Sequence, residues 1–157
     1  MRCMGVDPGT HRIGVGIIDI SGPKMICCHY ELIENSGDDK IANFKTTAAA
    51  ISRLVKKYKP DIASVEKLFF TSNQKTVMAV SEMRGVIINT IAGFNIPLSE
   101  YTPLQIKMGV TGYGKADKGQ IERMVRLILG IKEKIKPDDV TDALAIAICG
   151  ATNYNPY

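Results

Sequence analysis

Four acidic residues stand where carboxylates could gather around a cation. Asp7 and Glu66 each end a short apolar run of the kind that forms a buried strand. Asp139 and Asp142 lie three residues apart, so on a helix their side chains occupy adjacent turns of one face. Asp142 directly precedes the apolar run Ala143–Ile148, where a buried and unpaired charge would cost several kcal/mol. A carboxylate at that position needs a strong partner.

Together these carboxylates predict chemistry on a phosphodiester. In open α/β sheets, ligands collect at the carboxyl ends of the strands, where Asp7 and Glu66 would stand. Four like charges raise one another's pKa unless cations balance them. A cluster of oxygen ligands without Cys or His suits Mg²⁺ or Mn²⁺. Two such ions about 4 Å apart would clamp the attacking and leaving oxygens during in-line hydrolysis by water.

The aspartates also have explanations that involve no chemistry. An aspartate such as Asp7 commonly starts a turn, and here Pro8 and Gly9 follow it. Asp138 is a reasonable N-cap, and Asp139 in the first turn would interact favourably with the helix dipole. Helix capping explains Asp142 less well, because that residue opens the apolar run.

The first part of the chain predicts an antiparallel meander of three strands. We expect these strands over 1–7, 12–20 and 24–34, because the links between them are short and rich in proline and glycine. Gly14 and Gly16 fall on one face of the second strand. Glycines inside a strand often mark a place where another backbone comes close.

After the meander, helices alternate with strands. The apolar spacing predicts a helix over 41–58, a strand over 61–66 parallel to the first, a helix over 75–92, a strand over 96–101, a short helix over 103–108, a helix over 121–129 and a last helix that begins at Asp138 or Asp139. The sequence thus predicts an α/β fold in which helices flank a mixed sheet of five strands. Without an evident linker or repeat, residues 1–157 are expected to form one domain.

The composition fits a reduced, soluble protein. The net charge of +4 permits a polyanionic partner but does not require one. The four cysteines are expected to be buried reduced thiols, and two histidines are too few for a zinc site. We find no signal peptide and no apolar segment long enough to span a membrane. A cytoplasmic location is therefore expected.

Four motifs, in this order and at these separations, resemble the RuvC family of Holliday junction resolvases. These crossover junction endodeoxyribonucleases belong to the RNase H-like superfamily. The motifs are Gly5–Thr10 with the glycine-rich strand after it, Val65–Phe69, Gly112–Lys118 and Asp139–Ala145. The resemblance covers essentially the whole chain and implies an RNase H-like fold.

The resemblance implies that Asp7, Glu66, Asp139 and Asp142 are the catalytic, metal-binding acids. It implies Mg²⁺, two ions per site with Mn²⁺ as a substitute, and a homodimer that nicks two opposing strands of a four-way DNA junction. It further implies cooperation with a branch-migration helicase complex of the RuvA and RuvB type. The long helix over 75–92 is the expected dimer interface.

Three further residues match DNA-binding positions of the family. Phe69 matches an aromatic residue that stacks on an unpaired base, and Lys107 and Lys118 match basic residues near the cleaved phosphate. Core filling is the alternative for Phe69, although its place in a polar loop three residues after Glu66 favours stacking. Without the resemblance, each lysine would be interpreted as a solvated charge. Arg84, like other scattered basic residues, is not distinguished from ordinary surface charge.

Parts of the sequence also resemble other functional classes. The segment 109–116 nearly spells a phosphate-binding P-loop but has Ala116 where Ser or Thr must hold Mg²⁺. The turn after Asp7 resembles the phosphate loop of actin-like ATPases, which need two such domains. A junction-binding module without catalysis would lack at least one acid. A related nuclease that acts on RNA or on other branched DNA remains open from the residues alone.

Overall fold

The computed structural model describes residues 1–68 and 74–154, and it contains a mixed sheet of five strands. The strands lie in the order β3-β2-β1-β4-β5, with bounds β1 (Arg2–Asp7), β2 (Arg12–Ser21), β3 (Lys24–Glu34), β4 (Ile62–Glu66) and β5 (Leu98–Tyr101). The first three strands pair antiparallel, whereas β4 runs parallel to both β1 and β5. The predicted meander and mixed five-stranded sheet are confirmed.

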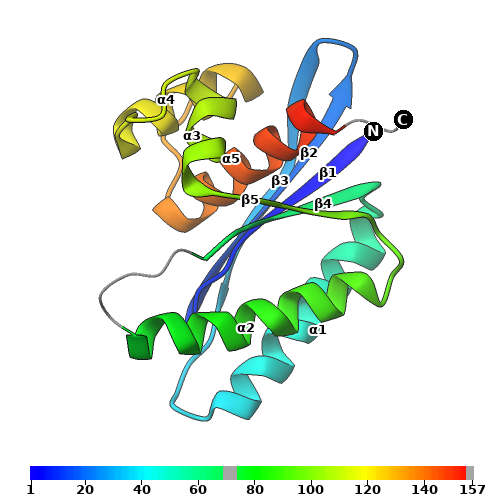
Figure 1. Cartoon of the computed structure of the whole chain (residues 1–157). Coiled ribbons are helices and arrows are strands. Elements are labelled where there is room, and N and C mark those ends of the chain that lie inside the picture. Colours follow the sequence, from blue (N-terminus) through cyan, green and yellow to red (C-terminus); the bar gives the residue numbers. More distant parts are fainter. Residues whose placement is uncertain (69–73, 155–157) are drawn as a thin grey trace.

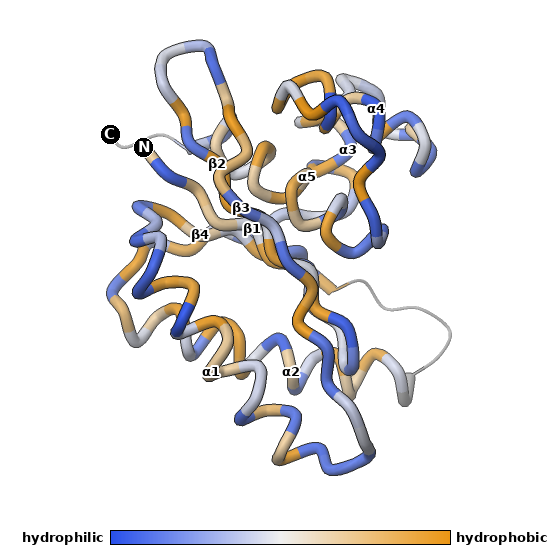
Figure 2. The backbone as a smooth tube through the Cα atoms, turned by 180° about the vertical axis from the view of Figure 1, so that it is seen from behind, coloured by the Kyte–Doolittle hydropathy of each residue, from blue (hydrophilic) through white to orange (hydrophobic). Residues whose placement is uncertain are grey.

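Helices cover both faces of this sheet (Figure 1). Their bounds are α1 (Lys40–Tyr58), α2 (Gln74–Ala92), α3 (Pro103–Thr111), α4 (Lys118–Leu129) and α5 (Asp138–Asn153). Helices α1 and α2 lie on one face, and α3, α4 and α5 lie on the other. The molecule therefore has two hydrophobic cores, one on each side of the sheet. Figure 2 shows that hydrophobic residues dominate the central strands, while α1 alternates between hydrophobic and hydrophilic positions.

Local sequence sets the helix boundaries near the candidate site. Thr102 and Gln105 form a capping box at the start of α3, and Asp117 and Gln120 form another at the start of α4. Gly112 adopts a left-handed conformation, with φ of 68°, and ends α3. The segment between α3 and α4 is therefore a short, well-defined turn.

Helix α3 is longer than the sequence predicted. It continues from Met108 through Gly109 to Thr111, whereas the glycine favoured a loop from residue 109 onward. The reason is a tertiary contact: a Cβ on Gly109 would lie 3.2 Å from Sγ of Cys149 on α5. Glycine lets the two helices approach closely, and packing outweighs its low helix propensity. The segment thus contains no P-loop.

The expectation of buried thiols is confirmed only for Cys3 and Cys149. All four cysteines are free, but Cys27 is half-buried and Cys28 is exposed. The cause is a β-bulge: Ile17 pairs with His29 and Ile18 with Cys27, which leaves Cys28 as the extra residue. Across the described ranges, no helix has both the length and the apolar character needed to cross a membrane.

Candidate active site

The sheet brings the first two acids together. Strands β1 and β4 pair parallel with Val6 opposite Val65, so the next residues, Asp7 and Glu66, lie at the same edge. Both strands are buried over most of their length, and burial decreases at these final residues. The prediction that two carboxylates stand side by side at the carboxyl ends of neighbouring strands is confirmed.

Helix α5 lies directly on the glycines of β1 and β2. A Cβ on Gly14 would be 1.9 Å from the carbonyl oxygen of Asp139, and one on Gly5 would be 2.2 Å from that of Ala143. Any larger residue at these positions would therefore force the helix away from the sheet. Because Gly14 pairs with Asp7 in the β-ladder, this contact sets the first turn of α5 beside the carboxyl end of β1.

The start of α5 differs from the sequence expectation in its cap. The helix begins at Asp138 as expected, but Pro137 occupies the N-cap position and no side chain caps the helix. Asp138 instead lies in the first turn, with 76% of its side chain exposed. Asp142 is half-buried, between the buried residues Val140 and Thr141 and the buried run that begins at Ala143.

The electrostatics show that the four acids influence one another. The pKa of Asp7 is raised to about 8, first because the carboxyl is buried, then because Asp142, Glu66 and Asp139 are negatively charged nearby. Burial and the charge of Asp142 also raise the pKa of Glu66. Burial raises the pKa of Asp142, although the positive charge of Lys118 opposes that shift. The cluster therefore carries more negative charge than its surroundings balance.

Two of the acids face basic side chains. Asp139 Oδ2 accepts hydrogen bonds from Arg12 Nη2 at 2.8 Å and from Arg12 Nε at 3.2 Å. Asp142 Oδ2 lies 3.8 Å from Lys118 Nζ. Asp7 and Glu66 form no ion pair with any residue in 1–68 or 74–154. The same ranges contain no group of three or more His, Cys, Asp or Glu side chains already arranged to hold a metal ion.

The donor set nevertheless fits a hard divalent cation. The four side chains offer carboxylate oxygens without sulfur or nitrogen, which is the ligand chemistry of Mg²⁺ rather than of zinc. Asp7 and Glu66 form no ion pair among the described residues, and repulsion from the other three acids adds to burial in raising the pKa of Asp7. A cation bound between the acids would relieve that repulsion.

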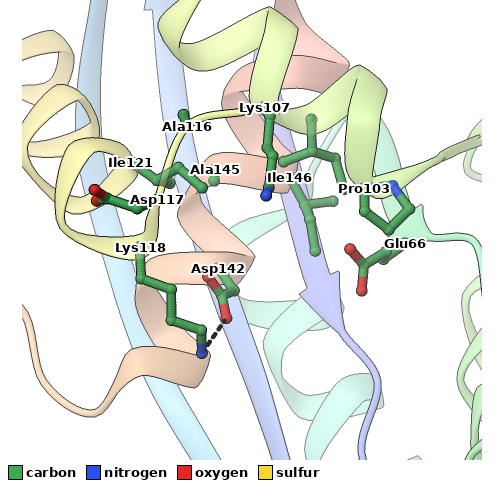
Figure 3. A pocket seen from close by; sticks show the side chains of 11 residues that line it. Glu66, Pro103, Lys107, Ala116, Asp117, Lys118, Ile121, Asp142, Ala145 and Ile146 are labelled. Carbon is green, nitrogen blue, oxygen red and sulfur yellow. Dashed lines mark ion pairs between the residues drawn. The ribbon is translucent and has the colours of Figure 1, made fainter. Parts of the chain in front are cut away.

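A pocket of about 380 Å³ opens next to the acids (Figure 3). Glu66 and Asp142 line it from β4 and α5, Lys107 from α3 and Lys118 from α4. Ile106, Ile121, Ala145 and Ile146 supply apolar lining. Both lysines of the sequence prediction therefore lie at the hollow that holds two of the acids, where they could contact an anionic group.

Arg84 has a positioning role that sequence patterns did not reveal. Its side chain is only 17% exposed, and its Nε donates a hydrogen bond of 2.9 Å to the backbone carbonyl of Glu66. Its guanidinium also forms an ion pair with Glu100 on β5. Arg84 thus fixes the end of β4, and it is held away from solvent rather than free to bind phosphate.

Phe69 lies outside the described residues, as does its neighbour Phe70. The proposed stacking role of Phe69 therefore stays a prediction. Arg12, in contrast, is a site residue that the sequence analysis missed, since 127 positions separate it from its partner Asp139. The one available signal was a basic residue that opens the strand after the Asp7 turn.

Comparison with known proteins agrees with this geometry. The sequence model of the family described as crossover junction endodeoxyribonuclease RuvC matches residues 3–150. A relative of that name from Moorella thermoacetica is 41% identical over 97% of this chain and 92% of its own length. One from Fusobacterium nucleatum is 45% identical over 94% of this chain and 78% of its own length.

Solved structures show the same relationship. Thermus thermophilus RuvC in complex with a Holliday junction substrate superposes with a TM-score of 0.92 and 28% identity, covering 97% of this chain and 93% of that chain. The yeast mitochondrial Holliday junction resolvase Ydc2 has a TM-score of 0.70 at 13% identity, over 96% of this chain and 78% of its own, which shows a shared fold. On this evidence, the chain belongs to the RuvC family of crossover junction endodeoxyribonucleases.

Proposed function

We propose that this chain resolves four-way DNA junctions by nicking two opposing strands symmetrically, with Mg²⁺ held by the four acids. One observation carries the proposal: Asp7 and Glu66 end neighbouring parallel strands beside the start of α5, which carries Asp139 and Asp142. The pKa of Asp7 is raised to about 8 there. The likeness to Thermus thermophilus RuvC, solved with a Holliday junction substrate, supports the choice of DNA junctions over RNA.

In this proposal each residue has a defined task. Asp7 and Asp142 would be the main anchors of Mg²⁺, and Glu66 and Asp139 would complete the ligand set. When bound, the ions supply activation of the attacking water and neutralisation of charge on the phosphate oxygens. Lys107 and Lys118 line the pocket beside Glu66 and Asp142, so they hold the phosphate next to the acids.

A nicking assay tests the proposal. It compares a synthetic mobile four-way junction with a linear duplex of the same sequence and with an RNA–DNA hybrid, each in Mg²⁺ and in chelator. We expect paired, symmetric nicks in the junction alone, and only with the metal. Cutting of the hybrid, or junction binding without nicks in any divalent metal, would instead favour one of the related functions.

Mg²⁺ should stabilise the folded protein. Binding that relieves repulsion among the acids adds RT ln(1 + [Mg²⁺]/Kd) to the free energy of unfolding, which is about 1.4 kcal/mol at ten times Kd. For a chain of this size, that corresponds to a rise in Tm of about 3–6 °C. Thermal denaturation with and without Mg²⁺ measures it, with Na⁺ at equal ionic strength as the control. An equal Tm in both salts would argue against a cation site in the folded state.

Phe69→Ala should impair junction cutting while leaving the fold intact. Stacking on an unpaired base contributes about 1–3 kcal/mol. Its loss should therefore lower the cutting rate by roughly 5- to 150-fold, which single-turnover kinetics on the junction would measure. The melting curve distinguishes the alternative, since a Tm far below that of the unchanged protein would place Phe69 in the core.

The proposed homodimer forms through α2. One side of α2 packs into the core through Met83, Ile87 and Ile91, while the opposite side is exposed. That opposite side carries Met78, which is 68% exposed, and the small residues Ser81, Gly85 and Ala92. A helix of a second copy could approach this stripe closely, and a two-fold dimer would match the symmetry of the junction.

Gly85→Arg should convert this dimer into a monomer. A Cβ on Gly85 would meet no atom within 4 Å in the single chain, so the fold should tolerate the substitution. In a dimer, the added charge would be buried between the two helices. Sedimentation velocity measures the change. A dimer that persists in the variant would place the interface elsewhere.

Cooperation with a helicase complex of the RuvA and RuvB type also belongs to this proposal.

A further inference from the structure

We propose that Lys134 and Lys136 form a second anion site, which binds backbone phosphates of the DNA strand where it leaves the catalytic pocket. This inference rests on the proposed junction cutting and adds a contact to it. The two lysines belong to the segment 130–137, which joins α4 to α5 and leads directly into Asp138 and Asp139.

The segment shows its lysines to solvent through an alternating pattern. Lys134, Ile135 and Lys136 lie outside any helix, and the middle residue is buried with 2% of its surface exposed, while both lysines are exposed. Ile135 belongs to the core cluster that contains α5, so the chain is anchored between the two lysines and both are left at the surface.

Hydrogen bonds also fix this segment. Arg126 on α4 donates through Nε to the carbonyl of Ile131 at 3.3 Å and through Nη2 to the carbonyl of Lys132. Glu122 lies 3.6 Å from Nη1 of the same guanidinium. Arg126 therefore holds the start of the segment and the buried Ile135 holds its middle, so ordering the backbone on DNA binding costs little.

Both lysines line a groove of about 490 Å³ beside the acids. Asp142 and Lys118 line this groove and the catalytic pocket alike, so the two hollows meet at these residues. A strand whose scissile phosphate lies at Asp142 would pass from one hollow into the other. The groove therefore lies where the neighbouring phosphates of that strand must go.

The charges in the groove favour an anion despite its acids. Arg12 pairs with Asp139, and Lys118 lies 3.9 Å from Asp138 and 3.8 Å from Asp142. Lys134 and Lys136, in contrast, form no ion pair with any described part of the chain. Their positive charges are thus unpaired. With them, the groove lining carries four basic side chains against three acids, and this excess of positive charge suits the phosphates of a nucleic-acid backbone.

The test is the salt dependence of junction binding by the double variant Lys134→Ala/Lys136→Ala. Binding is measured by fluorescence anisotropy in chelator, where no cutting occurs. If each lysine contacts one phosphate, the slope of log K against log salt should fall by about 1.8. The matched control is Lys45→Ala/Lys56→Ala, which removes two exposed lysines from α1 on the other face of the sheet. The control should leave the slope unchanged.

Neutral phosphates locate the contact. Methylphosphonates placed one at a time near the scissile position should weaken binding of the unchanged protein at one or two positions, and should not weaken binding of the double variant there. Equal slopes for the double variant and the unchanged protein, at equal Tm, would overturn the inference while leaving junction cutting standing. Failure of the unchanged protein to bind or cut the junction would overturn both.

Discussion

Asp7→Asn should lower the rate of junction cutting by more than about 1,000-fold. Loss of a single hydrogen-bond donor in an enzyme's electrostatic site already costs roughly 100- to 1,000-fold, and a metal-bridging carboxylate should cost at least as much. Asparagine keeps the size of the side chain but cannot carry a negative charge, so it removes the repulsion of Asp7 by Glu66, Asp139 and Asp142. Single-turnover nicking of a four-way junction measures the effect.

The same substitution should leave junction binding intact and remove the stabilisation by Mg²⁺. It should also raise the Tm of the metal-free protein, because a buried carboxyl in repulsion with three others is replaced by a neutral amide. Asp138→Asn is the matched control: this acid adjoins Asp139 but is 76% exposed, so cutting should change little. Retained cutting by the Asp7 variant would sink the proposal that the acids hold the metal.

Gly14→Ala should destabilise the fold severely. The added methyl carbon would lie 1.9 Å from the carbonyl oxygen of Asp139, which is backbone and cannot rotate away. Overpacking of this kind costs about 3 kcal/mol or more, which corresponds to a fall in Tm of at least about 6–12 °C. Thermal denaturation followed by circular dichroism measures it. Cutting by the folded fraction should fall as well, since α5 carries Asp139 and Asp142.

Gly93→Ala is the control for this clash. Gly93 follows α2, and a Cβ there would have its nearest neighbours at 3.4 and 3.6 Å, which is ordinary contact. The same chemical change should therefore move the Tm by no more than a few degrees. If Gly14→Ala and Gly93→Ala lowered the Tm equally, the close packing of α5 against β2 would not be what holds the acids in place.

The sequence predicted most of the sheet and the carboxylate positions, because both follow from local pattern. Apolar runs that end in Asp7 and Glu66 define strand ends, and helical spacing in the apolar segment after Asp142 defines a buried helix. The glycines of β2 also signalled a close approach, and the approaching element is α5. These features are set by residues within a few positions of one another, so single-sequence reasoning finds them.

Features that depend on distant parts of the chain were not predicted. The pairing of Arg12 with Asp139 joins opposite ends of the sequence. The extension of α3 through Gly109 depends on its contact with Cys149, and the exposure of Cys28 depends on how β3 pairs with β2. For Arg12 and Gly109 the deciding partner is far away in sequence. For Cys28 it is a bulge in the neighbouring strand pair, which no residue pattern marks.

The seat of α5 on β1 and β2 also determines when this enzyme acquires activity during its synthesis. A ribosome delivers Asp7 first and Asp139 and Asp142 more than 130 residues later, so a nascent chain that lacks α5 has only half of its acids. The bare glycine face of its sheet also stays open until that helix arrives. With the proposed role of the four acids, a partly made chain that lacks α5 is expected not to cut DNA.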